Sequence, residues 1–196
     1  MAAGRRAQCL NQRFAVALLE LSDQRRAAAI ATMPATTAPA TWCNPAETRQ
    51  TVEQYRNGEL VFDVIDRGPA DGPVVILLHG FPQTNASWAP VMDRLVAAGY
   101  RCVAPNLRGY SPGARPKGRR HYRASLLAGD VVALIDALGV DTVHLVGHDW
   151  GALVAWAVGA EAPQRLASLT AVSVPHPAAF LSAVLTSRQA LASTYM

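Results

Sequence analysis

Cysteines, long apolar runs and metal-binding motifs are scarce in this chain. Its three cysteines, Cys9, Cys43 and Cys102, are far apart and odd in number, which excludes a disulfide scaffold and favours a reducing, cytoplasmic compartment. The apolar run at 74–78 is much too short to span a bilayer, and Glu20 interrupts the apolar stretch that a signal peptide needs. Because no CxxC, HExxH or cysteine–histidine cluster occurs, we expect no metal and no other cofactor.

Apolar residues are abundant, and basic residues slightly outnumber acidic ones. Hydrophobic residues make up 51% of the 196 residues and charged residues 16%, which excludes disorder of the whole chain. The formal net charge is +4. Seven basic residues lie within 101–123 with no acid among them, and they suit either an anion-binding surface or a solvated loop broken by prolines and glycines. Since no nucleic-acid-binding motif accompanies them, we expect a loop and no nucleic-acid partner.

Residues 1–48 differ from the rest of the chain. Leu10, Phe14, Leu18 and Leu21 recur at helical spacing. The stretch 31–47 is rich in alanine, threonine and proline, which is typical of a linker. We therefore predict a poorly ordered N-terminal arm over 1–48 and a core domain over 49–196. Met33, which opens the linker, is a candidate for the biological start.

From Thr51 onward the apolar pattern becomes regular. Alternating segments flank Asn57-Gly58, a pattern that predicts a β-hairpin. The expected strands are 51–56, 60–66, 74–78, 100–104, 142–146 and 166–174, and the expected helices run from a cap at Ser87 to Gly99, from about 122 to 138, and from 150 to 162. This alternation predicts right-handed βαβ units, hence an α/β fold with a mostly parallel sheet behind an antiparallel hairpin.

The most informative stretch joins the strand at 142–146 to the next helix. It reads Gly147-His148-Asp149-Trp150-Gly151, the glycine-bounded pattern of a nucleophile elbow with aspartate where serine usually stands. Such a turn is too crowded for a Cβ at its glycines, and an anion at a helix N-terminus gains from the helix dipole. The alternative is that Asp149 only caps the helix.

A second turn completes the pattern. His79-Gly80-Phe81-Pro82 follows the buried strand at 74–78, where one N–H of an oxyanion hole is expected. Together with 106–111 (Asn-Leu-Arg-Gly-Tyr-Ser) and the aspartate elbow, it makes the sequence from about Val52 onward resemble the α/β-hydrolase superfamily, and more narrowly the epoxide hydrolases. Haloalkane dehalogenases are close relatives. The resemblance implies the α/β-hydrolase fold, and a small apolar epoxide (or alkyl halide) and water as substrates.

An aspartate nucleophile suits attack on an sp³ carbon, because the resulting alkyl ester can be hydrolysed at the enzyme's own carbonyl. The resemblance implies that Asp149 is the nucleophile and that the amides of Phe81 and Trp150 are the oxyanion donors. The residues expected to support the two turns are His79, Gly80, Pro82, Gly147, His148 and Gly151. A haloalkane dehalogenase is the alternative, but Phe81 lacks the side-chain N–H of a second halide donor.

The remaining histidines carry weaker expectations. His144 is expected to be a satisfied histidine within a buried strand, and His121 belongs to the basic loop. His176, between two prolines, is the one candidate for a general base. Asn106 stands where relatives often carry an aspartate, and we expect this departure to alter a structural hydrogen bond rather than the reaction.

The catalytic base and its acid are not evident. On this fold the triad order is nucleophile, acid, histidine, yet after Asp149 the only acid is Glu161 and the only histidine is His176. We therefore expect the C-terminal strands, the base and most of a cap to be missing from this chain, and Tyr195 cannot be assigned. Turnover should then stop at the alkyl ester, and the exposed sheet edge should permit association. A noncatalytic hydrolase-like scaffold is the competing hypothesis.

Overall fold

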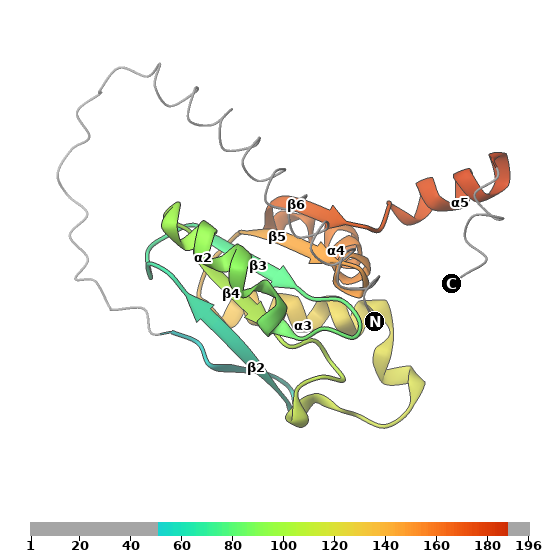
Figure 1. Ribbon diagram of the computed structural model, residues 1–196. Coiled ribbons are helices and arrows are strands. Elements are labelled where there is room, and N and C mark those ends of the chain that lie inside the picture. The colour runs from blue at the N-terminus through green and yellow to red at the C-terminus, as the bar shows by residue number, and fades with distance from the viewer. Residues whose placement is uncertain (1–50, 188–196) are drawn as a thin grey trace, which may run out of the picture. The chain divides into compact units, whose positions relative to one another are not determined.

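A computed structural model describes residues 51–187 (Figure 1). The predicted arm and linker over 1–48, the candidate start at Met33 and the residue Tyr195 lie outside this range. The described strands are β1 (Gln54–Asn57), β2 (Leu60–Arg67), β3 (Val74–Leu78), β4 (Arg101–Pro105), β5 (Val143–His148) and β6 (Leu166–Val172). The helices are α2 (Ala89–Ala97), α3 (Ala124–Ala137), α4 (Trp150–Glu161) and α5 (Pro177–Thr186), joined in places by short 3-10 turns.

The strands form one sheet in the order β1-β2-β4-β3-β5-β6. The hairpin strands β1 and β2 run antiparallel to their neighbours, whereas β4, β3, β5 and β6 are parallel. All five residues of β3 and all five of β4 are buried, because helices cover both faces of a parallel sheet. The predicted α/β architecture with an N-terminal antiparallel hairpin is therefore confirmed.

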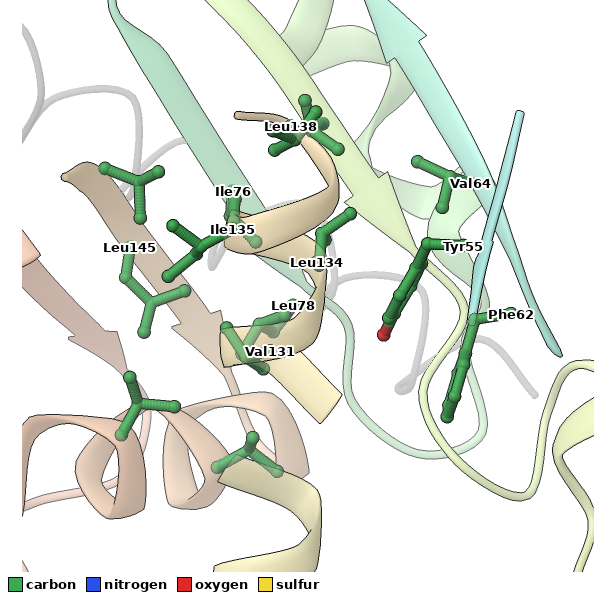
Figure 2. Close-up of a cluster of buried hydrophobic side chains, with 14 of the residues drawn as sticks. Tyr55, Phe62, Val64, Ile76, Leu78, Val131, Leu134, Ile135, Leu138 and Leu145 are labelled. Atoms are coloured by element: carbon green, nitrogen blue, oxygen red, sulfur yellow. The ribbon is translucent and has the colours of Figure 1, made fainter. Parts of the chain in front are cut away.

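The larger core lies between the sheet and the helices α3 and α4. Figure 2 shows Val131 and Ile135 of α3 beside Leu78 and Ile76 of β3, and Leu134 nearer the stacked rings of Tyr55 and Phe62. The two ring centroids lie 4.7 Å apart. Leu138, which directly follows α3, belongs to the same buried cluster. On the other face, Val91, Met92 and Leu95 of α2 are buried. This packing holds the strand ends from which the turns at 79–82 and 147–151 leave.

The predicted start of the first helix was wrong. Ser87 does not cap α2, because its hydroxyl donates to the carbonyl of Thr84 at 2.8 Å within a 3-10 turn over Asn85–Trp88. The α-helix begins after Trp88, with Pro90 in its first turn, where the missing proline N–H is tolerated. The predicted end was correct, since Gly99 adopts φ +88° directly after the helix. The first strand begins three residues later than predicted, and the other boundaries differ from prediction by at most two residues.

The basic run at 101–123 divides into two groups. Arg101 and Arg108 are buried, and each donates at 2.6 Å to a carboxylate from another part of the chain, Asp66 and Asp130 respectively. The other five basic residues of the run are exposed, and within the described range none of them forms an ion pair. The solvated-loop interpretation was therefore wrong for Arg101 and Arg108.

Between Thr51 and Ser187 no helix combines the length and the apolar character needed to cross a bilayer. Along the described sheet, β6 is the terminal strand and pairs only with β5. Its central residues are only partly buried. The sheet edge on this side is consequently open within the described residues.

Candidate active site

Asp149 occupies the turn between β5 and α4. Its backbone has φ +54° and ψ −119°, a left-handed conformation that non-glycine residues rarely adopt and that costs about 1–3 kcal/mol. The side chain makes no capping hydrogen bond to the helix. Helix capping therefore does not explain the aspartate, and its carboxylate is available for another contact.

That contact comes from the turn after β3. The backbone N–H of Phe81 donates to Oδ1 of Asp149 at 2.9 Å, so the structure brings together the two turns that the sequence singled out. Gly80 makes the approach possible, because a Cβ at this residue would lie 2.5 Å from the Asp149 Cβ. Pro82 follows through a cis peptide bond. The arrangement places a backbone donor on one carboxylate oxygen of Asp149, a half-buried residue whose backbone is strained.

The two glycines of the elbow are required by close backbone approaches. A Cβ at Gly147 would collide with the carbonyl of Gly151 across the turn, and a Cβ at Gly151 would collide with the carbonyl of Leu78 on β3. Both positions were predicted to be glycine because a Cβ would not fit there, and the structure confirms this lack of space. Their close packing brings the start of α4 against the end of β3.

His79 is the buried support of the donor turn. Its side chain, with 1% of the residue exposed, accepts a 3.0 Å hydrogen bond at Nε2 from the Leu107 amide and lies 3.0 Å from the Gly80 carbonyl at Nδ1. Burial lowers the pKa of the His79 imidazole, which favours the neutral ring. His79 therefore links the loop after β4 to the loop after β3.

The two aromatic residues beside Asp149 are exposed. Phe81 is 68% exposed and Trp150, the first residue of α4, is 58% exposed. The resemblance implies that the Trp150 amide is the second oxyanion donor, and the backbone N–H groups in the first turn of a helix have no partner within the helix. The hydrogen bond found in the structure comes from Phe81, and the Trp150 donor stays a prediction. His148 is half-buried, and burial lowers its pKa while the charge of Asp149 opposes the shift.

Tyr110 lies beside the site, and sequence reasoning missed it. Its ring meets the His79 ring edge-on, with centroids 4.5 Å apart. Burial raises the pKa of the Tyr110 phenol, and the negative charge of Asp149 raises it further, so the phenol and the carboxylate interact electrostatically. The available signal was its position just after the buried strand β4, which ends at the same sheet edge as β3 and β5.

His176 and Glu161 do not build a base and its acid. His176 accepts a 3.2 Å hydrogen bond from the Ala178 amide and so caps α5, while its ring meets Trp156 edge-on at 5.0 Å. Glu161 is the last residue of α4, about 16 Å along the helix axis from its first residue. Glu161 therefore cannot orient a base placed next to Asp149.

The other expectations concern structural contacts. His144 is partly buried, and its Nδ1 lies 2.8 Å from the Ser168 hydroxyl, as expected of a satisfied histidine. Asn106 accepts a 3.0 Å hydrogen bond from the Asn85 amide, a bond that an aspartate would also accept. No cluster of three or more metal-ligating side chains occurs in the part of the chain that the structure describes.

Comparisons with known proteins identify the fold family. Residues 73–193 match the family model described as alpha/beta hydrolase fold. Epoxide hydrolase B of Mycobacterium tuberculosis is 42% identical over 119 residues, 60% of this chain and 33% of that protein. The AB hydrolase superfamily protein YfhM of Bacillus subtilis is 39% identical over 118 residues, 60% of this chain and 41% of that protein.

A crystal structure of an epoxide hydrolase from Vigna radiata is similar with a TM-score of 0.58 and 40% identity, covering 71% of this chain and 46% of that chain. This chain thus spans less than half the length of each of these relatives. The family model covers more than half of the chain, and the mostly parallel sheet with its antiparallel N-terminal pair fits this fold. The chain belongs to the α/β-hydrolase fold family and is similar to its epoxide hydrolases.

Proposed function

We propose that this chain carries the nucleophile of an epoxide hydrolase-type reaction and that Asp149 forms an alkyl ester with a small apolar epoxide. One observation carries the proposal. The carboxylate of Asp149 sits on a strained elbow without capping its helix and accepts the Phe81 amide at 2.9 Å. A carboxylate held in this way has one oxygen fixed and the other free to attack.

In the first step the free oxygen of Asp149 bonds to one epoxide carbon, and the bond between that carbon and the ring oxygen breaks. The ring oxygen leaves as an alkoxide and takes a proton from an acid or from water. In the second step water attacks the ester carbonyl, and the Phe81 and Trp150 amides stabilise the oxyanion that forms on the carbonyl oxygen. Loss of the diol then restores the carboxylate.

The second step needs a base to activate water. His79 uses both ring nitrogens in contacts with backbone atoms, and His176 caps a helix. We therefore propose that the ester accumulates in this chain, because its formation does not require the base that its hydrolysis requires.

Intact-mass measurement after incubation with styrene oxide tests the proposal. The expected result is a mass increase equal to the whole epoxide, mapped to the peptide containing Asp149 and lost in Asp149→Asn. Absence of the adduct would favour the noncatalytic scaffold. Release of halide from a 1-haloalkane without any epoxide adduct would favour a haloalkane dehalogenase. Steady diol formation would contradict the accumulation of ester.

Two properties of the chain complete the proposal. The scattered cysteines favour a cytoplasmic protein. Strand β6 is uncharged and forms the edge of the sheet within the described residues, which favours association of copies by edge pairing. We expect Ala167→Lys on β6 to shift the protein toward monomer in light scattering, whereas Ala160→Lys, exposed on α4, serves as the control and should not. Equal behaviour of the two variants would count against edge pairing.

A further inference from the structure

One peptide group lies between His79 and the nucleophile. The carbonyl of Gly80 and the N–H of Phe81 belong to the same planar unit, and they point in opposite directions because the unit is rigid. On the N–H side this group donates to Oδ1 of Asp149 at 2.9 Å. On the carbonyl side it has two neighbours, Nδ1 of His79 and the amide of Gln83, each at 3.0 Å.

The direction of the His79 hydrogen bonds follows from its neighbours. The Leu107 amide can only donate, so Nε2 of His79 must accept and carries no proton in the neutral ring. The proton of the neutral ring is then on Nδ1, which donates to the Gly80 carbonyl. Tyr110, packed edge-on against the ring, restricts its orientation. The imidazole therefore has one tautomer that satisfies both contacts.

We propose that His79 is a positioning residue that acts on Asp149 through the Gly80–Phe81 peptide group, by donating from Nδ1 to the carbonyl whose own N–H holds the nucleophile. The inference rests on the proposed function of Asp149. A hydrogen bond to a peptide carbonyl polarises the N–H of the same group. It also fixes the direction of that N–H, and oxyanion donors act only when aimed at the developing charge.

The effect should be largest when the ester is hydrolysed, because the oxyanion develops on the oxygen that the Phe81 amide holds. Removing an oxyanion donor costs about 10²–10³ in rate. His79 acts on such a donor without being one, and we expect loss of its contact to slow the step about tenfold.

A matched pair of variants separates the two ring nitrogens of His79. The side-chain amide nitrogen of asparagine lies where Nδ1 lies, so His79→Asn can still donate to the Gly80 carbonyl. The longer side chain of glutamine reaches the position of Nε2, so His79→Gln can still accept from Leu107 but loses the donor to Gly80. Both variants remove the imidazole from the same buried site.

The test measures the decay of the styrene oxide ester by intact mass at alkaline pH, where hydroxide is the attacking nucleophile. We expect the ester to decay about tenfold more slowly in His79→Gln than in His79→Asn, irrespective of which variant has the higher melting temperature. Equal decay rates, or rates that simply follow the melting temperatures, would overturn the proposal and leave His79 a purely structural residue.

A second measurement does not depend on ester formation or on the folding of the variants. In ¹⁵N NMR spectra of the unsubstituted chain, the His79 ring should show a protonated Nδ1 and an unprotonated Nε2. The opposite tautomer would overturn the proposal. If no ester forms, the proposed function fails, while the tautomer still decides whether His79 donates to Gly80.

Discussion

The backbone amide of Phe81 donates a 2.9 Å hydrogen bond to Oδ1 of Asp149, which lies 68 residues further along the chain. The two residues meet because each follows one of two adjacent parallel strands. β3 and β5 pair in a register that sets Leu78 beside Gly147, and parallel strands end at the same edge of a sheet. The sheet register therefore determines where the Asp149 carboxylate and the Phe81 amide lie.

Replacing Gly80 by alanine should displace the donor turn. The added Cβ would lie 2.5 Å from the Cβ and 2.8 Å from Oδ1 of Asp149, so one of the two turns must move. Misplacing a reacting group by about 1 Å can cost about 10²-fold in rate. We therefore expect Gly80→Ala to slow ester formation by between about tenfold and about 10²-fold. Intact-mass measurement of the adduct with time gives the rate.

Gly129→Ala is the matched control for this substitution. Gly129 lies in α3, where the nearest atom to an added Cβ is 4.0 Å away. We expect the control to keep the rate of ester formation and to raise the free energy of unfolding by roughly 0.5–1 kcal/mol, because alanine favours a helix more than glycine. An unchanged rate in Gly80→Ala would contradict the close approach of the two turns.

The strain at Asp149 can be measured with two substitutions that both remove the carboxylate. Alanine keeps a Cβ at φ +54°, whereas glycine adopts this conformation without steric cost. We expect Asp149→Gly to be more stable than Asp149→Ala by about 1 kcal/mol in urea denaturation. Neither variant should form the ester. If the alanine variant is the more stable one, the elbow is not strained.

Local patterns in the sequence were enough to predict the central strands and the two turns that meet at Asp149. The strand 74–78 is a continuous apolar run, and its predicted and observed bounds agree because burial on both faces requires such a run. The contact of the Phe81 amide with Asp149 was predictable for a related reason. The position of a backbone amide is set by where its residue follows a strand and a glycine, and does not depend on that residue's side chain.

Contacts between distant segments could not be predicted in the same way. The acids that pair with Arg101 and Arg108 lie 35 and 22 residues away in sequence, so their pairing depends on strand register and on the path of a loop. The position of Tyr110 against His79 depends on the same loop. Ser87 was a plausible cap by residue type, and the 3-10 turn that displaced it leaves no clear periodic signal.

The buried ion pair between Asp66 and Arg101 should matter more for stability than a surface pair. Arg101 donates to both carboxylate oxygens of Asp66, at 3.0 and 2.6 Å, and the two side chains are 2–3% exposed. Asp66→Asn leaves a buried guanidinium without a counter-charge, which costs about 3–5 kcal/mol of unfolding free energy. Guanidinium chloride denaturation measures the loss.

The control for this prediction is Asp93→Asn. Asp93 pairs with Arg67 at 3.2 Å, but the two side chains are 70% and 46% exposed, and exposed pairs contribute between about 0 and 1 kcal/mol. We expect the control to lie within that range. Similar losses in the two variants would mean that burial of the Asp66–Arg101 pair does not determine its contribution.

The thiol of Cys102 should be unreactive in the folded protein. The residue is fully buried in β4, and burial, assisted by the charge of Asp66, raises the pKa of the thiol to about 12. Because the thiolate is the reactive form, iodoacetamide at pH 8 should leave Cys102 unlabelled until denaturant is added.

The raised pKa of the Cys102 thiol also has a consequence for stability. The ordinary pKa is 9.0, so between pH 9 and 12 the unfolded chain loses this proton while the folded chain keeps it, and stability falls as the pH rises. Cys102→Ala should remove this contribution and flatten the alkaline loss of stability relative to the unsubstituted chain. Rapid labelling of Cys102 without denaturant, or an unchanged alkaline profile in Cys102→Ala, would show that the thiol is not held neutral by its burial.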